Sequence, residues 1–64
     1  MSALHIKITL DNSAFKPYPE VEVGRILTVL ARRLDVMGLE GLQTVASLVD
    51  INGNKVGYAK VTGA

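Results

Sequence analysis

Apolar and polar residues alternate strictly over residues 3–10, which read ALHIKITL. One side of this segment carries Leu4, Ile6, Ile8 and Leu10, and the other carries His5, Lys7 and Thr9. A period of two residues is typical of a β-strand with one buried face. The pattern therefore predicts a first strand over residues 3–10.

A different spacing follows over residues 20–37, where apolar side chains recur every three or four positions. This spacing puts one apolar stripe on an α-helix. Pro19 suits the first helical position, and Gly38 suits a left-handed residue at the helix end. We expect residues 11–19 to form a connection, with Phe15 and Tyr18 covering an edge of the core. The predicted stripe consists of Val23, Ile26, Leu27, Leu30, Leu34 and Met37.

The last part of the chain predicts a β-hairpin. Segments 44–51 and 55–62 are rich in Val, Ile, Tyr and Thr, and Asn52-Gly53 lies between them. Asn-Gly is the strongest short hairpin signal, although Asn52-Gly53, Gly53-Asn54 and a loop one residue longer all remain open. Residues 39–43 are expected to form a loop.

The order strand, helix, strand, strand predicts a single α+β domain over residues 1–64. We expect a two-layer β-α-β-β fold, in which a three-stranded sheet carries one helix on one face. The hairpin strands must be antiparallel neighbours, and the helical crossover allows the first strand to lie parallel to one of them.

The hairpin has apolar residues on both sides of the predicted sheet. One set of alternate positions holds Ala46, Leu48, Ala59 and Val61, and the other holds Val45, Val49, Ile51, Val56 and Tyr58. One helix covers one side only, so the second set is the candidate interface, because contiguous exposed apolar patches usually mark interaction sites. The alternative is that these residues reflect strand propensity alone.

Size and composition favour oligomerisation over other means of stabilising a small fold. A chain of 64 residues buries a modest fraction of its surface, and this one has no cysteine and one histidine. Disulfides and thiolate metal sites are therefore excluded, and a homodimer is expected. No apolar run approaches the ~20 residues of a membrane span, and the first residues do not read as a signal peptide.

The polar residues around the hairpin turn raise the question of a metal site. Asp50, Asn52 and Asn54 offer oxygens at alternate positions, as in a calcium-binding EF-hand loop. The glycine and glutamate that this loop needs at its sixth and twelfth positions are missing, and both flanks are predicted strands. We interpret the segment as a turn in which Asp50 and Asn54 bond the local backbone, and we expect no metal or cofactor.

Two further groups of residues could carry chemistry. His5 has no nucleophile or carboxylate in a catalytic pattern nearby, so we expect no enzymatic activity. The basic residues of the helix could contact phosphates, but the formal net charge is only +1, and Glu22 is spaced to pair with Arg25. Nucleic-acid binding is therefore the less favoured expectation. Its candidate contacts are Lys16, Arg25, Arg32 and Arg33.

Three segments resemble small proteins encoded by tailed bacteriophages and prophages. They are DNSAF at 11–15, EVGRILTVLARRL at 22–34 and DINGNKVG at 50–57. Ser13 and Gly24 stand where such proteins commonly have alanine. The resemblance implies a virus-encoded protein acting in the cytoplasm of a bacterial host cell, and it brings no catalytic residues.

The expected function is therefore non-enzymatic binding of another protein, a host or phage protein, with inhibition of a host system as one form. Nucleic-acid binding and a structural role in the virion are the alternatives.

Overall fold

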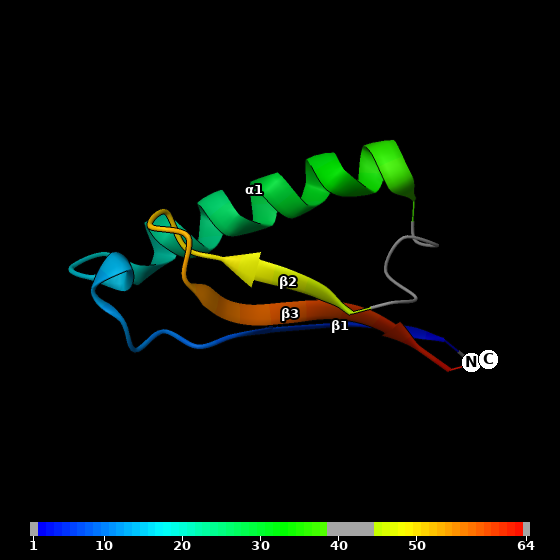
Figure 1. The fold of residues 1–64 in the computed structure, drawn as a ribbon, viewed down its shortest axis with the longest axis horizontal. Helices are drawn as coiled ribbons and strands as arrows, with labels where there is room; N and C mark the ends of the chain where they lie inside the picture. The colour runs from blue at the N-terminus through cyan, green and yellow to red at the C-terminus, as the bar shows by residue number, and fades with distance from the viewer. Residues whose placement is uncertain (1, 39–44, 64) are drawn as a thin grey trace.

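The computed structural model of the protein describes residues 2–38 and 45–63. In chain order its elements are β1 (Ala3–Ile8), the 3-10 turn η1 (Ser13–Phe15), α1 (Pro19–Met37), β2 (Ala46–Val49) and β3 (Lys55–Thr62). α1 runs along one side of a three-stranded sheet (Figure 1). The predicted α+β fold with one helix is confirmed. The loop predicted at 39–43, and residue 44 of the predicted second strand, lie outside the described residues.

β3 is the central strand of the sheet, in the order β1-β3-β2. Both neighbours are antiparallel to β3, so β1 runs parallel to β2 without pairing with it. Ala59 lies opposite Ile6 on one side and opposite Ala46 on the other. Directly opposite residues share a face of the sheet, so these three side chains lie on the side that α1 covers.

α1 begins and ends close to the predicted positions. Pro19 occupies its first turn, where a missing backbone N–H costs nothing, and Glu20 and Glu22 complement the positive end of the helix dipole. At the other end Gly38 adopts a positive φ of 67° and donates its N–H to the Leu34 carbonyl at 2.8 Å. No helix in the described residues is long and apolar enough to cross a membrane.

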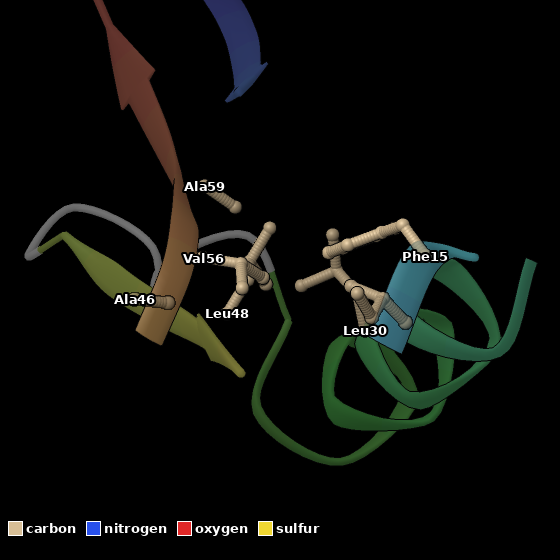
Figure 2. Packing of buried hydrophobic residues seen from close by; sticks show 7 residues of the cluster. Phe15, Leu30, Ala46, Leu48, Val56 and Ala59 are labelled. Carbon is tan, nitrogen blue, oxygen red and sulfur yellow. The ribbon is translucent and has the colours of Figure 1, made fainter. Parts of the chain in front are cut away.

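The hydrophobic core lies between α1, η1 and the strands β2 and β3 (Figure 2). Phe15 of η1 is the largest fully buried side chain, whereas Tyr18 is 65% exposed, so only one of the two predicted aromatic contacts is present. Leu27 and Met37 of the predicted helix stripe are also exposed. The core consists of Phe15, Ile26, Leu30, Ala46, Leu48, Val56 and Ala59.

The hairpin is shorter than predicted on its first strand. β2 ends at Val49 rather than at residue 51, and five residues, 50–54, with Gly53 at a φ of 85°, lead to β3. The register shifts between Leu48 and Val49, which face Gly57 and Lys55 respectively. This shift is a β-bulge, which adds one residue to β3 and turns the side chain of Val56 towards the core.

Candidate functional site

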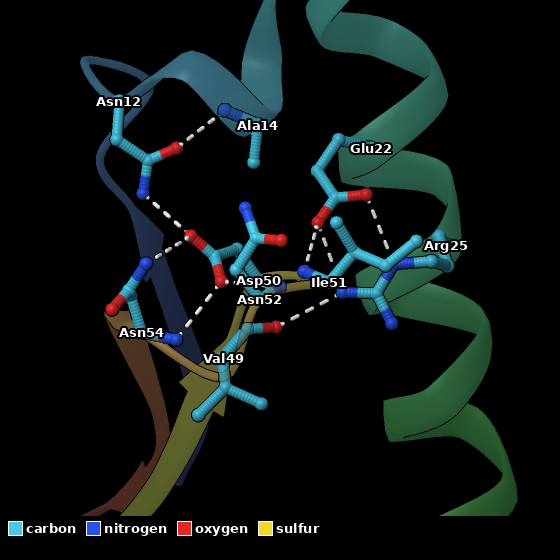
Figure 3. Close-up of polar contacts among 9 residues, drawn as sticks. All are labelled: Asn12, Ala14, Glu22, Arg25, Val49, Asp50, Ile51, Asn52 and Asn54. Atoms are coloured by element: carbon cyan, nitrogen blue, oxygen red, sulfur yellow. Dashed lines mark hydrogen bonds and ion pairs between the residues drawn. The ribbon is translucent and has the colours of Figure 1, made fainter.

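A buried carboxylate organises the hairpin turn. Asp50 Oδ1 accepts hydrogen bonds from the backbone N–H groups of Asn52 and Asn54, at 2.8 and 2.9 Å. Its Oδ2 accepts from the side-chain amides of Asn12, at 2.6 Å, and Asn54, at 3.3 Å (Figure 3). Asn12 also accepts from Ala14 N–H and so caps η1. The turn predicted from the sequence is present, and its carboxylate also binds a loop 38 residues earlier.

A second buried carboxylate joins the helix to the same turn. Glu22 forms a bidentate ion pair with Arg25, in which Nε donates to Oε1 and Nη2 donates to Oε2, each at 2.9 Å. Glu22 Oε2 also accepts a hydrogen bond from the Ile51 N–H at 2.8 Å. Arg25 in turn donates to the Val49 carbonyl at 3.1 Å. The ion pair predicted from the three-residue spacing is therefore confirmed, and it connects α1 to the end of β2.

The surroundings of both carboxyl groups favour their charged forms. The hydrogen bonds from Arg25 are the main cause that holds the pKa of Glu22 below its ordinary value. Burial raises the pKa of Asp50, but the bonds from Asn54, Asn12 and Asn52 outweigh burial, so this pKa is also lowered.

The polar cluster has a structural role. Four N–H donors occupy the oxygens of Asp50, so the lone pairs that a cation would need are already in use. Within residues 2–38 and 45–63, no group of three His, Asp or Glu residues is placed to hold a metal ion. The cluster ties η1, α1 and the hairpin turn together.

Two of the three helix arginines bind the protein's own backbone. Arg25 and Arg33 donate to the carbonyls of Val49, at 3.1 Å, and Ser47, at 3.2 Å. Arg32 is exposed. Lys16 lies before the start of α1 at Pro19, and Arg32 lies 13 residues, or about 20 Å of helix, beyond that start. The structure therefore does not bring the four predicted phosphate contacts together on one surface.

The predicted interface on the far side of the sheet is only partly formed. Val56 is 6% exposed and belongs to the core, which contradicts its predicted position, because the bulge turns it inwards. Ile51 is exposed but lies in the turn, beyond the end of β2. Val45 and Val49 are exposed as expected. Tyr58 is half-buried, with Lys60 Nζ 5.3 Å from its ring centroid.

The far side of the sheet is polar and basic instead of continuously apolar. The pairing register puts His5 beside Lys60, and Lys7 beside Tyr58, on this face. The strands β1, β2 and β3 carry no aspartate or glutamate. The expectation of a second large apolar face on the sheet was therefore wrong.

Exposed apolar side chains lie on the other side of the sheet, at β1. Leu4 and Ile6 face the side of the sheet that carries α1, yet they are 42% and 41% exposed. The cause is the position of the helix, which packs on η1 and β2 and leaves β1 farthest away (Figure 1). Ile8 and Val61 continue this surface into the core. We call Leu4, Ile6 and Ile8 the β1 strip.

Sequence reasoning missed the β1 strip, because strict alternation predicts that Leu4 and Ile6 are buried. The exposure of the β1 strip could have been expected only from the widths of the two layers. One helix is narrower than a sheet of three strands, so one edge strand must remain uncovered. The sequence did not say which edge this is.

No protein-family model, no curated protein and no solved structure matches this chain.

Proposed function

We propose that this protein acts without catalysis, by associating with itself and with another protein through the β1 strip. The observation that supports this most directly is the exposure of Leu4 and Ile6 on the helix side of the sheet, next to the core. Single exposed apolar residues are common on proteins, but a contiguous apolar surface is typical of an interaction site.

The resemblance of three segments to phage proteins suggests the kind of partner. It favours a protein of the phage or of its bacterial host, met in the cytoplasm, and inhibition of a host system is one way such binding could act. This part of the proposal rests on the resemblance alone.

Light scattering on matched variants tests the proposal. We expect the wild-type protein to associate with rising concentration, and the double variant Leu4→Ser/Ile6→Thr to remain monomeric, because burial of apolar surface drives association. Val36→Thr is the control, because Val36 is 89% exposed on α1, away from the strip. It should behave as the wild type does.

The same variants serve as bait in a bacterial lysate. A partner that binds through the strip should be captured by the wild type and by Val36→Thr, and lost with the double variant. A wild-type protein that stays monomeric and whose captured proteins are the same for all three baits would contradict the proposal.

Nucleic-acid binding is a second candidate, favoured now by the far side of the sheet rather than by the helix arginines. His5, Lys7 and Lys60 lie there without an acidic neighbour on any strand. Phosphate contacts are lost as salt rises, so DNA binding that weakens steeply between low and moderate salt would support this candidate. Lack of binding at low salt would remove it.

A further inference from the structure

The two edge strands of the sheet, β1 and β2, differ in whether their outward backbone groups are hydrogen-bonded. Thr9 N–H donates to the Val56 carbonyl at 2.8 Å, so the odd-numbered residues of β1 direct their backbone groups towards β3. Backbone groups alternate in direction along an antiparallel strand. The N–H and C=O groups of Leu4, Ile6 and Ile8 therefore point away from β3, in the plane of the sheet, and form its free edge.

The same reasoning gives the outward groups of β2. β3 directs Gly57 and Ala59 towards β2, where they face Leu48 and Ala46, so Ser47 and Val49 direct theirs outwards. Arg33 binds the Ser47 carbonyl and Arg25 binds the Val49 carbonyl, while Glu22 binds the next outward N–H, that of Ile51. The side chains of α1 thus block the β2 edge.

The β1 edge has no such protection. In the described parts of the chain, no side chain and no further strand bonds the outward groups of Leu4, Ile6 or Ile8. Unpaired strand edges with apolar side chains are ready templates for pairing with another strand.

We propose that β1 pairs antiparallel with β1 of a second copy of this chain, about a two-fold axis at Ile6, to give one continuous six-stranded sheet. This inference rests on the proposed function and names the way in which the β1 strip associates. In this register Ile6 lies opposite Ile6 of the second copy, Leu4 opposite Ile8, and His5 opposite Lys7. All outward backbone groups of residues 4–8 then find partners.

A second copy of the chain fits this edge better than an arbitrary strand does. A two-fold axis normal to the sheet keeps apolar side chains opposite apolar ones and polar side chains opposite polar ones. The contact is small, because a six-residue strand is about 20 Å long and covers a few hundred Å² per copy, below the ~800 Å² of a standard interface. We therefore expect a weak dimer, which salt strengthens by screening Lys7 and Lys60.

Cysteine cross-linking tests the register, because the natural chain contains no cysteine. Opposite residues in a hydrogen-bonded antiparallel pair have Cα atoms about 5.5 Å apart, within the range of a disulfide. Ile6→Cys should therefore oxidise to a covalent dimer at least about tenfold faster than the controls. Lys7→Cys is the control on the same strand, because in the proposed register residue 7 lies opposite His5 and the two cysteines are not directly opposite one another. Val36→Cys is the control on α1.

A proline variant tests the edge itself. Ile6→Pro removes an N–H that no group in residues 2–38 and 45–63 of the same chain uses, so the chain should fold and stay monomeric at concentrations where the wild type associates. Ile6→Val keeps both the N–H and an apolar side chain and should associate as the wild type does. Circular dichroism confirms that each variant is folded.

The outcomes separate this inference from the proposed function. If the wild type associates, but Ile6→Cys cross-links no faster than Lys7→Cys or Ile6→Pro still associates, edge pairing is wrong and association through the strip stands. If the wild type remains monomeric to millimolar concentration, self-association fails and the inference fails with it.

Discussion

Two glycines occupy opposite kinds of environment, and only one of them is required by the fold. Gly57 lies on β3 between Ile8 and Leu48, and a Cβ atom there would overlap the backbone carbonyl of Lys7. Gly24 lies on the exposed side of α1, where a Cβ atom would meet nothing within 4 Å. The sequence alone suggests that Gly24 weakens the helix, but the need for Gly57 follows only from the strand register.

We predict opposite effects for alanine at these two positions. Gly24→Ala should stabilise the protein by about 1 kcal/mol, because alanine loses less backbone freedom in a helix. Gly57→Ala should destabilise it by about 2 kcal/mol or more, because a backbone atom must move. Urea unfolding of the two variants measures both changes, and equal effects of the same sign would show that the β1–β3 contact is looser than described.

The two buried carboxylates predict how stability depends on pH. The pKa values of Glu22 and Asp50 are lowered in the folded protein, so their contribution is fully present above the unfolded values, near pH 4, and is lost as the pH falls through the folded values. The urea midpoint should therefore be nearly constant between about pH 7 and pH 5 and should fall steeply below about pH 4.

Glu22→Gln and Asp50→Asn serve as comparisons in that titration. Each variant should be less stable than the wild type at neutral pH, because a charged acceptor with several donors is lost. Each should also lose less stability on acidification. An acid response identical to that of the wild type would show that these groups do not govern it.

At the scale of the elements, the sequence predicted α1 and the three strands, but not the pairing register between β2 and β3. Periodicity placed β1, α1, β2 and β3 to within a few residues, and the Asn52-Gly53 turn is where the hairpin signal put it. The bulge opposite Leu48 and Val49 has no signature in the apolar pattern, so the position of Val56 was predicted on the wrong face. The bulge changes the face of Val56 alone, and Tyr58, Ala59 and Val61 after it lie on the faces predicted for them.

Substitution of the α1 arginines tests whether their side chains keep the β2 edge from pairing with other strands. Removal of the Arg33 side chain frees the Ser47 carbonyl at the β2 edge, so Arg33→Ala should increase aggregation on heating or prolonged storage. Arg32→Ala is the matched control, because it removes the same charge from the neighbouring residue, whose side chain is exposed. Turbidity that rises equally for both variants would indicate an effect of net charge rather than of the edge.

At the scale of the whole molecule, the lateral position of α1 decides which surfaces are open. The sequence predicted that one helix covers only one side of a three-stranded sheet, and it placed the uncovered apolar surface on the far side. In the structure the far side is basic, and the uncovered apolar surface lies on the helix side, over β1. Asn12, Glu22 and Asp50, far apart in sequence, hold the helix beside the hairpin, and no local pattern reveals such a set of contacts.

Backbone amide spectra of the wild-type protein, recorded by NMR over a dilution series, test the central claim that the β1 edge is the association site of this fold. We predict that the amide signals of Leu4, Ile6 and Ile8 move most with concentration, and that those of Ser47 and Val49, at the blocked edge, stay in place. Shifts confined to β2 or to the outer side of α1, or no shifts up to millimolar concentration, would contradict the account.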